Sequence, residues 1–202
     1  VASGNSRRMR VYDITSDSWS FASMAPSGYE SAEGVGLAHD GKFYSVGGRS
    51  FTGQGKELLM YDPEMDTWTV LPAMSFSRQG LAAAVVGNSI YAIGGRTGGG
   101  PFSAGQTNKV EKYDIDNGTW TVVADLPAPR SDLAAATMGG KIYVFGGYDG
   151  TNVLNDVMMY NPVTDSWTEG LEPIPTLRGA LYAVGNKGNE VLVIGGWNGV
   201  YP

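Results

Sequence analysis

The sequence predicts an all-β protein built from repeats, and two observations support this prediction. Pairs of glycines end an apolar run at four places, and their first members, Gly47, Gly94, Gly146 and Gly195, are 47, 52 and 49 residues apart. A tyrosine and a tryptophan seven positions apart follow the same period, at Tyr12 and Trp19, Tyr61 and Trp68, Tyr113 and Trp120, and Tyr160 and Trp167. A fixed period of this length is typical of stacked repeat units. With 30 Gly and 10 Pro in 202 residues, short apolar runs lie between turn signals, which favours strands over helices.

Each repeat contains four predicted strands, and residues 129–167 show them most clearly. The first strand, near 133–137, has small apolar side chains and ends at Gly139-Gly140, a dipeptide suited to a tight hairpin turn. The second strand, 141–145, leads into Gly146-Gly147, where the missing Cβ atoms allow a sharp turn against a neighbouring chain. The third strand ends at Tyr160 and the fourth begins near Trp167. We expect the paired tyrosines and tryptophans to pack across this outer hairpin, in the core between sheets.

These motifs resemble the kelch repeat. The segments "IYVFGG" and "VMMYNP", an arginine near the first strand and a tryptophan seven residues after the tyrosine carry the resemblance, and "IYAIGG" and "FYSVGG" repeat it in other copies. The resemblance covers nearly all of the chain. It implies a β-propeller, in which each repeat is a four-stranded antiparallel blade around a central channel. Kelch propellers usually have five to seven blades, whereas this chain holds four blades' worth of sequence.

We expect a single propeller domain over 1–202. It divides into a half blade (7–21), three blades (32–70, 80–122 and 132–168) and a second half blade (179–196). From Gly196 to the C-terminus is 6 residues and Tyr12 adds 12, which together equal the 18 residues from Gly95 to Tyr113. Because the lengths match, we expect that the two half blades can pair. Pairing is also favoured because an open sheet edge exposes unpaired backbone N–H and C=O groups. Pairing within one chain gives a four-bladed ring, and pairing between chains gives a homodimer through the open edges. A piece cut at the same loop from a longer array of repeats would show the same number of residues.

The charge balance and composition limit the partners. The chain has 14 basic and 20 acidic residues, a net charge of −6, which disfavours nucleic acid or an anionic membrane as a general partner. It has no cysteine, so disulfides and thiolate metal sites are excluded. No apolar run approaches the roughly 20 residues that span a bilayer. We expect a soluble protein, cytoplasmic or secreted, with no cofactor and no metal.

The arginines point to a candidate ligand-binding face. Because strands alternate in direction, the turns between strands 1 and 2 and between strands 3 and 4 share one face, which collects aspartates. The 2–3 and 4–1 connections form the opposite face. The residues of this second face that we predict to bind a ligand are Arg49, Arg78, Arg96, Arg130, Arg178, Ser131, Tyr148 and Trp197. Guanidinium and aromatic groups around an apolar channel mouth suit a carboxylate, a phosphate or an acidic peptide. The set resembles the ligand face of kelch adaptor proteins, which grip peptides with Arg, Ser and Tyr.

A structural role stays open for three of these arginines, and the same face offers further candidate contacts. The arginine before strand 1 (Arg78, Arg130 and Arg178) belongs to the kelch repeat itself, where it often hydrogen-bonds loop carbonyls and holds blades together. The long Gly-rich loop at 96–108 is a candidate recognition element, and Phe51 and Phe76 are candidate exposed contacts.

We favour a non-enzymatic module that binds a protein or an acidic peptide. His39 is the only histidine, so a histidine-based triad or multi-histidine metal site is unavailable. The alternative is a carbohydrate-active enzyme that resembles the kelch-fold sialic acid epimerases and takes an anionic sugar. In that alternative an arginine holds the sugar carboxylate, and Glu30 or Asp132 moves a proton.

Overall fold

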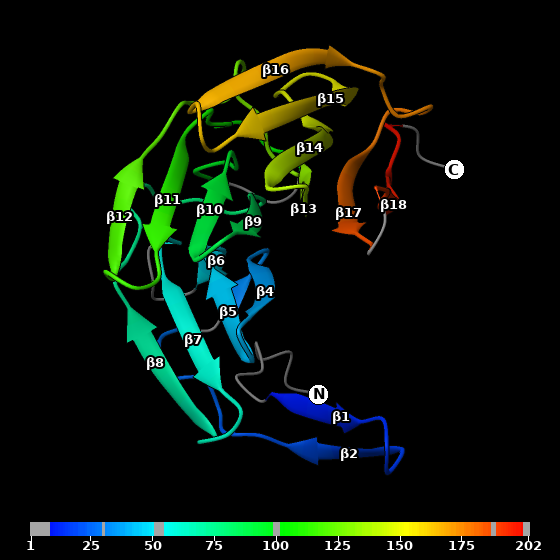
Figure 1. Cartoon of the computed structure of the whole chain (residues 1–202). Coiled ribbons are helices and arrows are strands. Elements are labelled where there is room, and N and C mark those ends of the chain that lie inside the picture. Colours follow the sequence, from blue (N-terminus) through cyan, green and yellow to red (C-terminus); the bar gives the residue numbers. More distant parts are fainter. Residues whose placement is uncertain (1–8, 30, 51–54, 99–101, 187–188, 200–202) are drawn as a thin grey trace.

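The computed structural model describes residues 9–29, 31–50, 55–98, 102–186 and 189–199. In these residues every regular element is a strand, and all strand pairs are antiparallel. The sheets follow one another in an arc around a common centre, with their innermost strands nearest that centre (Figure 1). The structure confirms the predicted all-β propeller architecture.

Three complete blades form the middle of the arc. Each is a four-stranded sheet in which strand order follows the chain. Blade 1 consists of β4 (Val35–His39), β5 (Lys42–Val46), β7 (Leu58–Asp62) and β8 (Thr67–Leu71). Blade 2 consists of β9 (Ala82–Val86), β10 (Ser89–Ile93), β11 (Val110–Asp114) and β12 (Thr119–Val122). Blade 3 consists of β13 (Ala134–Met138), β14 (Lys141–Tyr148), β15 (Val153–Asn161) and β16 (Ser166–Leu171).

Three two-stranded sheets complete the described structure. β1 (Arg10–Asp13) pairs with β2 (Ser18–Phe21), β3 (Ser31–Ala32) with β6 (Arg49–Ser50), and β17 (Gly179–Gly185) with β18 (Val191–Trp197). Among the described residues β1–β2 and β17–β18 do not pair with each other, and the arc stays open between them (Figure 1). In the part of the chain that the structure describes, closure within one chain, one of the two predicted routes, is therefore not formed.

The double glycines join successive blades. The second glycine of each pair donates its N–H to the carbonyl of the residue that precedes strand 1 of the next blade. These bonds are Gly48 to Arg78 (3.0 Å), Gly95 to Arg130 (2.9 Å) and Gly147 to Arg178 (2.8 Å). The first glycine has a positive φ, for example 51° at Gly146. There an added Cβ would lie 2.4 Å from the Arg178 carbonyl oxygen, so only glycine permits this approach.

The tyrosine–tryptophan pairs lie directly opposite each other on strands 3 and 4, with ring centroids 5.0–5.2 Å apart. In the complete blades the tryptophan also reaches the preceding blade, because its Nε1 donates to a carbonyl there. The bonds are Trp68 to Ser23 (2.9 Å), Trp120 to Pro72 (2.7 Å) and Trp167 to Ala124 (2.9 Å).

One of the four pairs is not in the core. The rings of Tyr12 and Trp19 are in tilted contact, but Trp19 is 67% exposed because no described blade precedes β1–β2. The expectation that all eight residues are buried is therefore wrong at this half blade.

Aspartates in the 3–4 turns stabilise those turns. The Asp13 carboxylate accepts the N–H groups of Thr15 (2.7 Å) and Ser16 (3.1 Å), and these bonds lower the pKa of Asp13. Asp66 instead accepts the hydroxyl of Tyr61, which raises the pKa of Tyr61 to about 12. At least part of the acidic face thus has a structural explanation.

Candidate ligand-binding face

A chain of backbone hydrogen bonds runs around the channel mouth. Four equivalent residues have left-handed backbones: Glu33 (φ 61°), Gly80 (57°) and Asp132 (56°) just before strand 1 of their blades, and Ala180 (54°) near the start of β17. The last three each donate their N–H to the carbonyl of the counterpart in the preceding blade, from Gly80 to Glu33 (3.1 Å), from Asp132 to Gly80 (2.7 Å) and from Ala180 to Asp132 (2.7 Å). The same backbone geometry in each blade therefore places the side chains of Glu33 and Asp132 at the rim.

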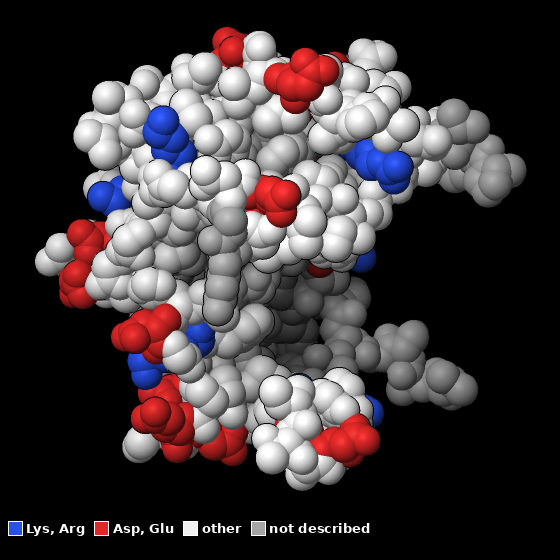
Figure 2. Space-filling view, turned by 45° about the vertical axis from the view of Figure 1, so that its right-hand side comes forward, with Lys and Arg blue, Asp and Glu red and all other residues white. Residues whose placement is uncertain are grey.

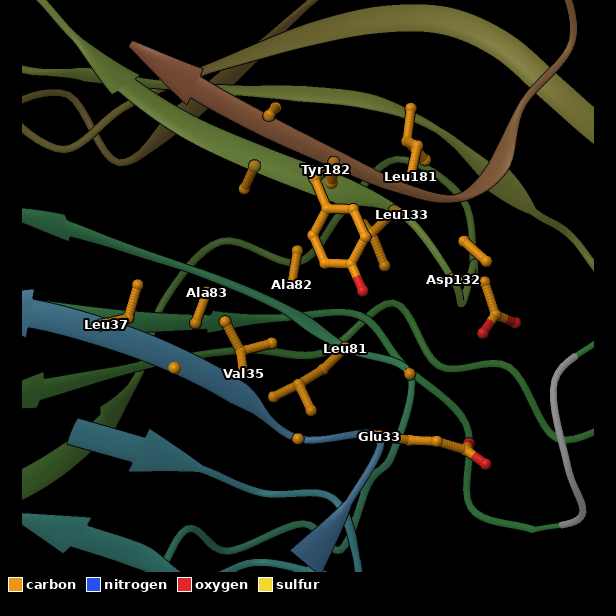
Figure 3. A pocket seen from close by; sticks show the side chains of 17 residues that line it. Glu33, Val35, Leu37, Leu81, Ala82, Ala83, Asp132, Leu133, Leu181 and Tyr182 are labelled. Atoms are coloured by element: carbon orange, nitrogen blue, oxygen red, sulfur yellow. The ribbon is translucent and has the colours of Figure 1, made fainter. Parts of the chain in front are cut away.

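Below this rim lies a cavity of about 370 Å³ between the innermost strands. Its walls are apolar, and its charged lining residues in the described structure are Glu33 and Asp132 (Figure 3). The space-filling view shows the hollow opening on one side of the molecule, while most charged side chains visible there lie around the periphery (Figure 2). The mouth of the channel is therefore lined by carboxylates.

The arginines before strand 1 bind within their own blades. Each donates from Nη1 to the carbonyl of the first glycine of its double glycine: Arg78 to Gly94 (3.2 Å), Arg130 to Gly146 (3.3 Å) and Arg178 to Gly195 (2.9 Å). This shared bond agrees with the structural reading of the repeat arginine.

Two of these arginines also take a carboxylate from strand 3 of their blade. Arg78 pairs with Glu111 at 2.5 Å, where both side chains are buried, and Arg130 pairs with Asp156 at 2.7 Å. Burial lowers the pKa of Arg78, and the Glu111 charge partly offsets that effect. The Arg78 and Arg130 guanidinium groups are enclosed, so direct ligand contact by them stays a prediction that our proposal does not use.

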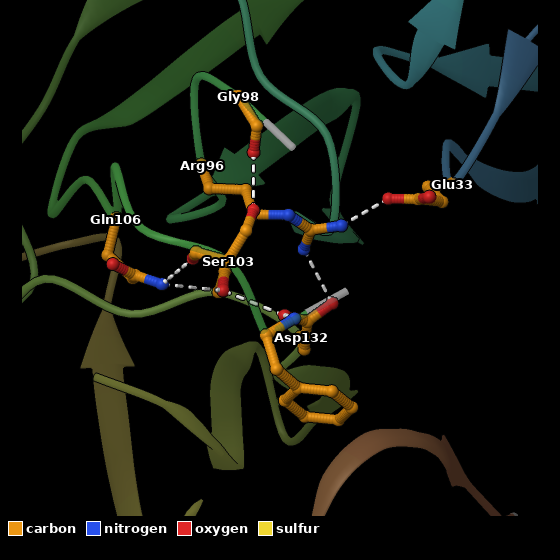
Figure 4. A network of polar contacts seen from close by, with 8 residues as sticks. Glu33, Arg96, Gly98, Ser103, Gln106 and Asp132 are labelled. Carbon is orange, nitrogen blue, oxygen red and sulfur yellow. Dashed lines mark hydrogen bonds and ion pairs between the residues drawn. The ribbon is translucent and has the colours of Figure 1, made fainter. Parts of the chain in front are cut away.

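Arg96 connects three blades. Its side chain is 0% exposed and donates from Nη2 to Glu33 of blade 1 and from Nη1 to Asp132 Oδ1 at the start of blade 3, at 2.6 Å (Figure 4). The buried Ser131 hydroxyl donates to the other Asp132 oxygen at 2.8 Å. Arg96 and Ser131 were predicted ligand contacts, but the side chains of both are engaged inside the fold. The partners of Arg96 lie 63 and 36 residues away in the sequence, whereas Ser131 binds the adjacent Asp132.

The remaining predicted residues are accessible. Arg49 is exposed on β6, and Arg178, Tyr148 and Trp197 are half-buried. Tyr148 and Trp197 come together through Phe102, whose ring centroid lies 5.5 Å from that of Tyr148 and 4.5 Å from that of Trp197.

Phe102 was not among the predicted site residues. It lies in the long loop at 96–108, which the sequence did single out, and its position after Pro101 in a Gly-rich loop was the available signal. Phe51, another candidate, lies outside the described residues, and Phe76 is exposed.

The carbohydrate-enzyme alternative depended on Glu30 and Asp132. Glu30 lies outside the described residues, while both Asp132 oxygens accept hydrogen bonds, from Arg96 and from Ser131 and the Phe102 N–H. His39 faces Asn88 at 2.9 Å in the hairpin turns of the opposite face. The described residues contain no group of three or more His, Cys, Asp or Glu side chains that could hold a metal ion. Nor do they include a helix with the length and apolar character needed to cross a bilayer.

Comparison with known proteins agrees with this architecture. Residues 36–202 match the family model of the KLHDC2/KLHL20/DRC7 kelch-repeats domain, so the chain belongs to the kelch-repeat family. It is 30% identical over 200 residues to Kelch-like protein terF of Aspergillus terreus, covering 93% of this chain and 43% of that protein. It is 28% identical to Kelch-like protein 25 of Xenopus tropicalis, covering 80% and 26%. The chain thus spans less than half the length of these relatives.

A solved structure supports the fold. The structure titled "Structure of YjhT" superposes with a TM-score of 0.77 at 18% identity, over 95% of this chain and 68% of that one. At this identity the likeness concerns the propeller fold alone.

Proposed function

We propose that this domain is a non-enzymatic module that binds a protein or peptide through an anionic group, at the face formed by the 2–3 and 4–1 connections. Membership of the kelch-repeat family supports a protein-interaction module. The observation that carries the anionic part is the chemistry around Arg178. In blades 2 and 3 the equivalent arginines each bind a carboxylate, so this position selects a carboxylate twice within the chain itself.

Arg178 keeps a donor for such a group. Its Nε binds the Thr176 hydroxyl (2.9 Å) and its Nη1 binds the Gly195 carbonyl (2.9 Å). Within the described part of the chain its Nη2 makes no hydrogen bond, and the side chain is half-exposed. Arg49 adds a second accessible guanidinium on the same face. These two residues, rather than the five predicted arginines together, are the cations that our proposal uses.

Binding of fluorescein-labelled octaglutamate, with octalysine as the opposite-charge probe, tests the proposal by fluorescence anisotropy. We expect octaglutamate to bind, and we expect its affinity to fall as the salt concentration is raised, because the contact is ionic. The double variant Arg49→Gln with Arg178→Gln is expected to lower the affinity at least tenfold. Lys141→Gln, which removes a positive charge from the opposite face, serves as the matched control and is expected to change affinity less than twofold. Equal binding of octaglutamate by the double variant and the wild type would refute the proposal.

A further inference from the structure

Three aromatic rings from three blades meet near Arg178, on the face formed by the 2–3 and 4–1 connections. Phe102 comes from the 2–3 loop of blade 2, Tyr148 ends β14 of blade 3, and Trp197 ends β18. Phe102 packs edge-on against Tyr148 (88° between ring planes) and obliquely against Trp197 (54°). We call these three residues the aromatic patch. All are half-buried, so each ring is supported from below and keeps part of its surface exposed.

The patch is held in place by hydrogen bonds as well as by packing. Phe102 has a left-handed backbone (φ 60°), and its N–H donates to Asp132 Oδ2 at 3.2 Å. Asp132 is itself fixed by Arg96, as Figure 4 shows, and by the Ser131 hydroxyl. A residue positioned through buried partners loses little freedom when a ligand contacts it, which favours binding.

The absence of a side chain at Gly179 leaves room for the Phe102 ring. A Cβ at Gly179 would lie 2.7 Å from Phe102 Cε1, and the backbone of Gly179 is not left-handed, so the space rather than the conformation calls for glycine here. Gly179 also pairs with Trp197 across β17 and β18. The absent side chain thus lets a loop of blade 2 reach over to the fourth sheet.

Arg178 borders the patch directly. It precedes Gly179 in the chain, and its Cβ lies 3.4 Å from where a Cβ on Gly196, the residue before Trp197, would stand. Arg178 Nη1 also binds the Gly195 carbonyl, two residues before Trp197, so a guanidinium with a spare donor lies within two residues of the aromatic patch along the chain. Aromatic rings and arginine are the side chains that most often dominate the binding energy of protein interfaces.

Resting on the proposed function, we propose that the partner is a peptide segment with an acidic residue next to a bulky apolar one. The carboxylate binds Arg178, and the apolar side chain lies on the aromatic patch. Charge complementarity selects the acidic residue, and burial of the exposed ring surface selects the apolar neighbour.

Three capped tetrapeptides separate the two contacts: acetyl-Ala-Glu-Leu-Ala-amide, its Leu-to-Ala analogue and its Glu-to-Gln analogue. The readout is ¹⁹F NMR of protein labelled with 5-fluorotryptophan, in which Trp197→Phe assigns the Trp197 signal. We expect the Glu-Leu peptide to shift this signal and to bind at least fivefold more tightly than the Glu-Ala peptide. Phe102→Ala is expected to abolish that fivefold preference, whereas Phe76→Ala, an exposed ring elsewhere on the same face, is expected to leave it unchanged.

A second variant guards against loss of folding in Phe102→Ala. Gly179→Ala displaces the Phe102 ring without removing it, and we expect it to reduce the preference as well. Equal affinity for the Glu-Leu and Glu-Ala peptides would overturn the inference and leave the proposed function standing. Equal affinity for the Glu-Leu and Gln-Leu peptides would overturn the pairing of carboxylate with Arg178 and, with it, the anionic part of the proposed function.

Discussion

Arg78 and Glu111 form an ion pair in which both side chains are almost fully enclosed, at 0% and 1% exposure. Glu111 also accepts the N–H of Ser75 through its other oxygen at 2.7 Å, and Arg78 Nη1 donates to the Gly94 and Lys109 carbonyls. The repeat arginine of blade 3, Arg130, pairs with Asp156, whose side chain is 46% exposed. Asp156 lies four residues before the strand-3 tyrosine and Glu111 two residues before it, so the shared arginine position takes its carboxylate from a different strand position in each blade.

Glu111→Gln and Asp156→Asn are predicted to differ strongly in stability. Glu111→Gln leaves the Arg78 charge buried without a counter-charge, which costs roughly 3–5 kcal/mol of unfolding free energy. Asp156→Asn breaks a partly exposed pair and costs about 1 kcal/mol or less. Urea denaturation of both variants measures the difference, and similar losses would contradict the assignment of Glu111 as a buried counter-charge.

At the scale of the element, the double glycine is the joint between blades. Gly146 has a positive φ and no room for a Cβ, since its neighbours are the Arg178 and Leu154 carbonyls. Gly139, in the hairpin turn of the same blade, also has a positive φ (58°), but an added Cβ there would meet nothing within 4 Å. The two glycines therefore share a backbone requirement and differ in their surroundings.

Gly146→Ala is predicted to be much more costly than Gly139→Ala. The change at Gly139 adds only left-handed backbone strain, about 1 kcal/mol. The change at Gly146 adds a clash with backbone atoms as well, for a total of roughly 2–4 kcal/mol. Thermal unfolding monitored by circular dichroism compares them, and an equal fall in midpoint would show that the blade joint tolerates a side chain.

At the scale of the molecule, the open arc leaves an apolar face on its last sheet. Tyr182, Val184, Leu192 and Ile194 are exposed on β17 and β18. The residues at the same repeat positions in blade 2, Ala82, Ala84, Tyr91 and Ile93, are buried against blade 3. The sequence pattern is the same, and only the presence of a following blade differs.

Ile93→Ala and Ile194→Ala test this difference, because both residues precede a double glycine. Ile93 is 0% exposed, so its truncation is predicted to cost roughly 2–5 kcal/mol. Ile194 is 59% exposed, and its truncation is predicted to cost less than about 1 kcal/mol. Chemical denaturation at several protein concentrations supplies the measurement. A large, concentration-dependent loss at Ile194 would mean that this face is covered in solution.

The period of the glycine pairs and of the tyrosine–tryptophan pairs, with the turn residues, was sufficient to predict an all-β protein with four strands in each repeat, and the resemblance to the kelch repeat implied the propeller. These features are local: each hairpin is specified by turn residues and alternating strands within about 40 residues. The family resemblance also implied a structural role for Arg78, Arg130 and Arg178, the arginines before strand 1, and this role agrees with the bond that each makes to a glycine carbonyl.

Which arginines reach solvent was decided only by the tertiary structure. Arg96 is neutralised by Glu33 and Asp132, which are 63 and 36 residues away, and no local pattern relates these three positions. Phe102 likewise joins the aromatic patch because its loop crosses to another blade. Residue type and spacing by themselves determined the strands of each blade and predicted one face on which cations gather. The site that we propose, with Arg49, Arg178 and the aromatic patch, depends on long-range ion pairing and packing, because a charge stays available to a ligand only where the fold brings it no partner.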